Sequence, residues 1–295
     1  MLRANETITL PDKRQLGYFT IDRGGSGGVP VVYFHGTASS RLEALLLEQV
    51  SLRKIELIAV DRPGYGLSTY NPRKTLQDFN NDLNYLINHL GLAQFNVLGW
   101  SGGSVFAIAY MTSFPQKVRR GIIVSAPNLP FDPAVAHNTP FAKYAMKLPA
   151  IGSIVMRNMQ RQILKANTPK AFLQSTQGKQ MLHACSKNDL TFFSNPKWIK
   201  LLHQSIAEAF RQKNSVKTII EEHTLFLKPC NLSICEIGDK LQIWHGKEDK
   251  TCPINNAYQI AHKFKGAKLK IFSNKGHYFI FDHLDQIAQS LTENI

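Results

Sequence analysis

Continuous apolar runs alternate with amphipathic stretches along much of this chain. The apolar runs are VPVVYF (29–34), IELIAV (55–60), FNVLGW (95–100) and LQIWHG (241–246), and helical periodicity separates them. This alternation is typical of β-α-β units around a parallel sheet that is covered on both faces. Before them, two short β-branched runs around a Pro-Asp turn predict a hairpin. The sequence therefore predicts an α/β fold.

The helix expected over 75–90 has the clearest pattern. Its apolar residues recur at helical spacing, and Thr75 and Asp78 form a capping pattern in front of them. A later strand is expected in KLKIF, followed by a last helix from about residue 279.

The regular alternation stops after Pro127. Helical stretches punctuated by prolines follow, without strong strand runs, until the alternation resumes. We interpret this region as a helical cap inserted into a core domain. The expected organisation is a first core segment (1–127), the cap (128–235) and a second core segment (236–295).

Composition places few further limits on the protein. With 295 residues and 43% hydrophobic content, the chain can bury a large core. No apolar run approaches the length of a membrane span, and the polar start lacks a signal peptide, so we expect a cytoplasmic protein. The four cysteines form no CxxC pair. Reduced thiols and no metal site are therefore expected.

The net charge of +14 is concentrated in the expected cap. Residues 128–235 hold 14 Lys or Arg and 5 Asp or Glu, a balance of +9. Clustered cations attract anionic substrates and would allow weak contact with an anionic membrane surface, although a solvated lid is the commoner arrangement. No nucleic-acid motif surrounds these residues, so no nucleic-acid partner is expected. The methionines of this region suit an adaptable apolar pocket, with ordinary helix packing as the alternative.

Ser101 is the candidate nucleophile. It lies in GWSGG, between an expected strand and a helix expected from Gly102 to about Phe114. A nucleophile elbow requires this context, because glycines at positions 99 and 103 avoid collisions beside a serine in a tight, strained turn. GxSxG alone is a weak signal, and a glycine-rich turn is the alternative. The order Ser, Asp, His along the chain favours the elbow.

His277 and Asp249 are the candidate partners of this serine. His277 follows the last expected strand, where its imidazole can take the serine proton and later return it to the leaving group. Asp249 follows the preceding expected strand and can fix the imidazole tautomer. Its neighbour Glu248 is the rival carboxylate.

An oxyanion that forms during acyl transfer needs two hydrogen-bond donors. The candidates are the backbone N–H of Gly102 and that of Thr37, in the HGT loop after the first buried strand. His35 precedes this loop and is interpreted as a structural residue that holds it.

These motifs resemble the alpha/beta-hydrolase family with a helical cap. The resemblance covers 29–126 and 241–295, in HGTASS, DRPGYGLS, GWSGG, GKEDKTCP and GHY. It implies a mostly parallel central sheet flanked by helices, with a cap that shapes the acyl pocket. It favours Asp249 as the acid and implies a structural role for the loop Asp61–Ser68. Arg62 in this loop could reach a substrate, but a structural role is commoner.

The preferred function is that of a serine hydrolase. We expect Ser101 to attack an ester-like bond of a small or lipid-like acyl substrate, and a water activated by His277 to hydrolyse the acyl-enzyme. The resemblance makes a carboxylesterase the default, and serine at position 101 argues against epoxide hydrolases and haloalkane dehalogenases. No cofactor is expected. An acyltransferase, an amide or carbon–carbon bond hydrolase, and a non-catalytic small-ligand receptor remain alternatives.

Overall fold

The central element of the fold is one eight-stranded sheet with strand order β1-β2-β4-β3-β5-β6-β7-β8. The computed structural model describes residues 2–22, 27–47, 55–72, 75–127, 129, 149–226 and 237–293. The strands are β1 (Leu2–Thr9), β2 (Gln15–Asp22), β3 (Val29–Phe34), β4 (Ile55–Val60), β5 (Phe95–Trp100), β6 (Val118–Val124), β7 (Leu241–Gly246) and β8 (Lys268–Phe272). The β1–β2 and β2–β4 pairs are antiparallel and the other pairs are parallel. The predicted α/β fold and the N-terminal hairpin are confirmed.

Successive residues of the strands point to opposite faces of the sheet. In β3, Val31 and Tyr33 join one core cluster, whereas Val32 and Phe34 join the other. Among the helices that flank the sheet, α1 (Ala44–Leu47) and α12 (Leu284–Thr292) contribute to the first cluster, and α2 (Asp78–His89), α3 (Gly102–Ser113) and α11 (Asn255–Lys263) contribute to the second. Because both faces are covered there, the central parallel strands β3, β4, β5 and β7 are almost entirely buried, whereas the last strand, β8, is partly exposed.

Two expected helix starts were wrong. The helix expected from residue 75, α2, begins at Asp78. Thr75 lies before the helix and donates its N–H (3.0 Å) and its hydroxyl (2.9 Å) to the Asp78 carboxylate. The last helix does not start at 279, since a 3₁₀ turn, η4 (Phe279–Asp282), precedes α12. The first three residues of η4 are all buried. Three consecutive buried side chains do not share one face of an amphipathic helix.

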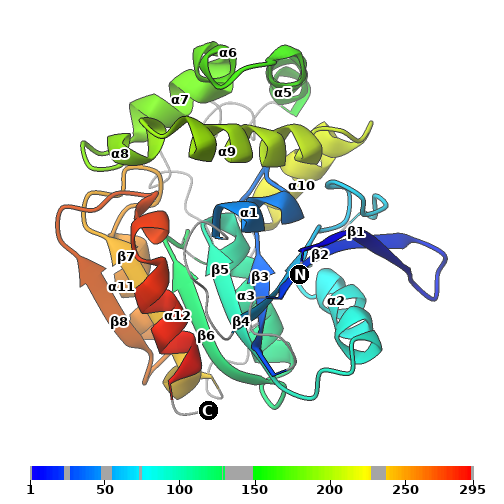
Figure 1. Cartoon of the computed structure of the whole chain (residues 1–295), viewed down its shortest axis with the longest axis vertical. Helices are drawn as coiled ribbons and strands as arrows, with labels where there is room; N and C mark the ends of the chain where they lie inside the picture. The colour runs from blue at the N-terminus through cyan, green and yellow to red at the C-terminus, as the bar shows by residue number, and fades with distance from the viewer. Residues whose placement is uncertain are drawn as a thin grey trace.

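Six α-helices lie between β6 and β7 in the described part of the chain. They are α5 (Pro149–Lys165), α6 (Pro169–Gln174), α7 (Thr176–Ala184), α8 (Leu190–Phe193), α9 (Pro196–Ala209) and α10 (Ser215–Phe226). Prolines begin three of them, as their fixed φ suits a first helical turn. Figure 1 shows this group stacked at one end of the sheet, with α9 between α5 and the core. The cap boundaries expected at 128 and 235 lie outside the described residues.

Buried ion pairs join these helices to the core. The Arg62 guanidinium donates to both oxygens of Glu222 in α10, at 2.9 and 2.8 Å, and to the carbonyl of His35 at 2.5 Å. Arg41 donates to Asp61 at 2.6 Å and to α9 through Glu208 at 3.0 Å. These contacts hold Arg62 between the core and α10, which supports a structural role for it.

Cys185 and Cys252 are free thiols and buried, whereas Cys230 and Cys235 lie outside the described residues. Within the described ranges, no group of three or more His, Cys, Asp or Glu could hold a metal ion. Likewise, no helix in the part of the chain that the structure describes is long and apolar enough to cross a bilayer.

Candidate active site

Ser101 lies in a sharp turn between β5 and α3. Its φ of +51° is a left-handed conformation that a serine rarely adopts, and such strain is typical of functional turns. A Cβ added at Gly103 would lie 2.0 Å from the carbonyl oxygen of Phe34. Only glycine at this position lets α3 approach the end of β3. The turn therefore has the geometry of the predicted nucleophile elbow.

The order of the strands opens a space beside this elbow. β3 pairs with both β4 and β5, so the connections after β3 and β5 leave the sheet at the point where the strand order reverses. Thr37 follows β3 and Gly102 follows β5. A Cβ built on Gly102 would lie 3.2 Å from the backbone nitrogen of Thr37. The two candidate oxyanion donors therefore border the same small space.

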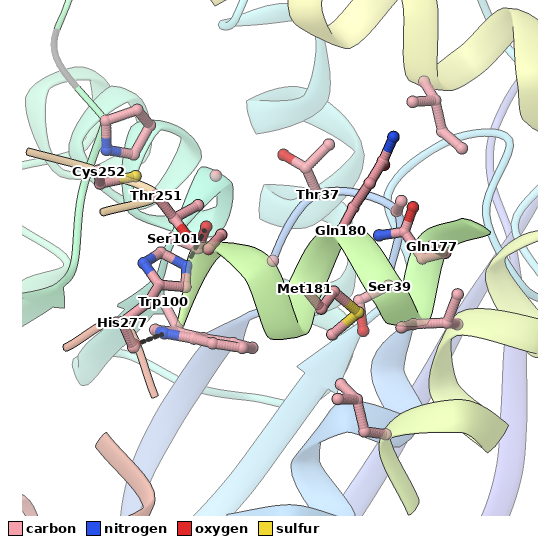
Figure 2. A pocket seen from close by; sticks show the side chains of 18 of the residues that line it. Thr37, Ser39, Trp100, Ser101, Gln177, Gln180, Met181, Thr251, Cys252 and His277 are labelled. Carbon is pink, nitrogen blue, oxygen red and sulfur yellow. Dashed lines mark hydrogen bonds between the residues drawn. The ribbon is translucent and has the colours of Figure 1, made fainter. Parts of the chain in front are cut away.

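The structure also brings the predicted histidine and aspartate to Ser101. His277, after β8, places Nε2 3.1 Å from Ser101 Oγ and Nδ1 2.8 Å from Asp249 Oδ2. Figure 2 shows the His277 ring facing Ser101. The neighbour Glu248 is exposed to solvent. The three predicted side chains thus form a continuous hydrogen-bonded chain.

The charges around these three side chains favour a positively charged imidazole on His277 beside a negatively charged carboxylate on Asp249. Burial would lower the pKa of His277, but the Asp249 carboxylate outweighs it and raises this pKa. Burial would likewise raise the pKa of Asp249, but His277 and the Cys252 N–H outweigh it and lower this pKa. His245 lies 3.7 Å from Asp249, and its burial lowers its own pKa, which favours the neutral ring.

Two further side chains near the elbow have defined partners. His35 is fully buried and its Nδ1 bonds the Gly36 carbonyl at 2.8 Å, in keeping with a structural role. Glu43 was not predicted from the sequence. Its Oε1 accepts the Tyr33 hydroxyl at 2.7 Å and the Gly36 N–H at 2.8 Å, and burial raises its pKa. Its position inside an amphipathic stretch gave no signal of a cavity residue.

Ser101 and His277 open on a cavity of about 580 Å³ between the core and the cap helices. Figure 2 shows α7 crossing this cavity, with Gln177, Gln180 and Met181 on it. Apolar residues of the cap helices supply much of the wall: Met156, Met159, Met181, Leu202, Ile206, Ile219 and Phe226. Three of the methionines that suggested an adaptable pocket therefore line it, while Met146 lies outside the described residues.

Comparison with known proteins identifies the family. A family model described as the alpha/beta hydrolase fold matches residues 29–284. The chain belongs to the alpha/beta hydrolase family. This alpha/beta hydrolase is similar to a putative proline iminopeptidase of Mycoplasma pneumoniae, with 26% identity over 277 residues that cover 86% of each protein. A proline iminopeptidase of Xylella fastidiosa is 24% identical over 281 residues, covering 86% of this chain and 85% of the relative.

Solved structures agree with the fold. An esterase from Exiguobacterium antarcticum superposes on this alpha/beta hydrolase with a TM-score of 0.68 and 19% identity, covering 97% of each chain. The family expected from the sequence motifs is confirmed. The match and the named relatives support a hydrolase.

Proposed function

We propose that this alpha/beta hydrolase cleaves carboxylic esters of small, largely apolar acyl compounds through an acyl-enzyme on Ser101. The observation that carries the proposal is the chain of contacts from Ser101 Oγ to His277 Nε2 (3.1 Å) and from His277 Nδ1 to Asp249 Oδ2 (2.8 Å). With Nδ1 protonated towards Asp249, Nε2 has a lone pair that can accept the serine proton.

The reaction has two stages. Ser101 Oγ attacks the carbonyl carbon of the substrate as the hydroxyl proton of Ser101 passes to His277 Nε2. The resulting oxyanion accepts hydrogen bonds from the backbone N–H groups of Thr37 and Gly102. Collapse breaks the ester bond, and the leaving alkoxide takes the proton from Nε2. A water then loses a proton to Nε2 and attacks the acyl carbon, which releases the acid and restores Ser101.

The cavity favours an uncharged acyl group over a cationic one. Its wall is mostly apolar, and Glu43 is the one acidic residue among the described residues that line it. This carboxylate is already engaged by Tyr33 and Gly36, and burial raises its pKa. Among these residues, a protonated amine would find only this one carboxylate, which is already hydrogen-bonded, to offset its desolvation.

Amide hydrolysis is the second candidate, because two relatives are named as proline iminopeptidases. The same nucleophile and base can cleave an amide. Such a substrate carries a free N-terminal amine, so the engaged state of Glu43 argues for the ester.

The test is hydrolysis of a series of acyl p-nitrophenyl esters and of prolyl p-nitroanilide, by the wild type and Ser101→Ala. The matched control is Ser113→Ala, at the far end of α3. We expect ester turnover that depends on chain length, is lost in Ser101→Ala and is kept in Ser113→Ala. Ester turnover by Ser101→Ala, or faster cleavage of the anilide than of every ester, would contradict the proposal. Absence of all turnover with tight ligand binding would indicate a receptor.

A further inference from the structure

A carboxylate of the cap lies against the loop that carries His277. Asp189 directly precedes α8 and is only 3% exposed. Its Oδ2 accepts the backbone N–H of His277 at 3.0 Å, and its Oδ1 accepts that of Tyr278 at 2.9 Å. The Ser186 N–H, 2.9 Å from Oδ2, holds the carboxylate on the cap side. Asp189 therefore links the cap directly to the backbone of the candidate base.

The core holds the same backbone from the opposite side. The carbonyl oxygen of His277 accepts the indole N–H of Trp100 at 3.1 Å and the hydroxyl of Ser125 at 3.3 Å. Cap and core thus bind the two polar backbone groups of one residue. Because the imidazole projects from this backbone, a rotation here would move Nε2 away from Ser101.

Residues 186–189 of the cap fit closely against the loop that carries His277. A Cβ added at Gly276 would lie 1.9 Å from Asp189 Oδ2 and 2.4 Å from Ser186 Oγ. The Asn188 side chain also bonds the carbonyl of Asn274. Residues 186–189 therefore pack on the histidine loop along several residues, and only glycine at position 276 permits this approach.

We propose that Asp189 is a positioning residue, which fixes the His277 backbone so that turnover requires the cap to be docked on the histidine loop. The inference rests on the proposed function, in which His277 is the general base. Asp189 is not among the residues that line the cavity, so it acts through His277 and does not bind the substrate.

The charge of Asp189 provides a signature that a merely structural contact lacks. Titratable groups from four parts of the fold surround the imidazole. His245 and Asp249 lie at and after the end of β7, Glu43 lies in the η1 turn (Arg41–Glu43), Tyr278 lies in the histidine loop, and Asp189 lies in the cap. Burial would lower the pKa of His277, and Asp249 outweighs this, with Asp189 and Glu43 adding to the increase. Loss of the Asp189 charge removes part of this stabilisation of the imidazolium. The base then stays neutral to lower pH.

The experiment compares Asp189→Asn with Gln212→Ala in ester hydrolysis over a range of pH. Gln212 is a matched control, because it also joins the cap to the core, through bonds to the carbonyls of Gly66 (2.8 Å) and Ser68 (2.6 Å). For Asp189→Asn we expect kcat on the pH plateau to fall by roughly 10- to 100-fold with KM little changed. The acid limb of kcat/KM should move down by about half a pH unit. Gln212→Ala should keep both values.

Wild-type kcat and acid limb in a folded Asp189→Asn variant would overturn the proposal. The same loss and shift in Gln212→Ala would also overturn it, since any weakening of the cap would then suffice. If Asp189→Asn lacks a cooperative thermal transition, Asp189→Ser removes the charge with a smaller side chain and must show the lowered acid limb. Failure of the proposed function is distinct from these results, because it would appear as ester turnover that survives Ser101→Ala, as faster cleavage of the anilide than of every ester, or as absence of all turnover by the wild type.

Discussion

The carboxamide of an Asp249→Asn variant is expected to adopt one orientation. In the wild type, Asp249 Oδ1 accepts the N–H groups of Thr251 (2.9 Å) and Cys252 (2.7 Å), while Oδ2 lies 2.8 Å from His277 Nδ1. Asparagine has only one side-chain oxygen. An amide nitrogen at the Oδ1 position would face two backbone donors, so the oxygen must remain there and the nitrogen must face His277.

This orientation gives the wrong imidazole tautomer. The amide nitrogen donates to Nδ1, and the ring proton therefore moves to Nε2. Nε2 then has no lone pair for the proton of Ser101. A wrong tautomer in a Ser-His-Asp triad lowers kcat by about 10⁴-fold, and we expect a loss of that order here. It corresponds to roughly 5 kcal/mol of transition-state free energy.

The assay is steady-state hydrolysis of the best p-nitrophenyl ester at neutral pH, with thermal unfolding to verify the fold. Glu248→Gln is the matched control, because Glu248 is adjacent in sequence and exposed. We expect its kcat to stay within about twofold of the wild type, as for other surface substitutions. An Asp249→Asn variant within about tenfold of the wild type, or equal effects of the two substitutions, would refute the tautomer argument.

Three further results are expected. Glu222→Gln leaves the buried Arg62 charge without its ionic partner and should lower the free energy of unfolding in urea by about 3–5 kcal/mol. Lys217→Ala, which removes an exposed charge 3.9 Å from a carboxylate, should change the free energy of unfolding by about 0.5 kcal/mol or less. Equal losses of stability in Glu222→Gln and Lys217→Ala would contradict the role of the buried ion pair. Because the pKa of His277 is raised, kcat/KM should fall with decreasing pH at a midpoint above the ordinary histidine pKa of about 6.5. A midpoint below this value would contradict a raised pKa of His277. If the basic cap steers substrates, kcat/KM for an acidic ester should fall with salt while that of a neutral ester of equal length changes little; identical responses would exclude steering.

The sequence predicted the elements and side chains that have local signals. The strand expected at 241–246 has those bounds as β7, and GWSGG indicated the turn at Ser101 because its glycines are required by contacts next to it in the fold. Asp189 and Glu43 carried no such signal. Asp189 contacts a backbone 88 residues away, and no periodicity within its own helical stretch could indicate that partner.

Labelling with a fluorophosphonate tests whether Ser101 is an activated nucleophile, because this reagent reacts with an activated serine and does not depend on the choice of substrate. The measurement is the mass of the intact protein, followed by peptide mapping, for the wild type and Ser101→Ala. We predict one adduct per chain on Ser101 and none in Ser101→Ala. Stoichiometric labelling that persists in Ser101→Ala, or an adduct that maps to another residue, would contradict this prediction.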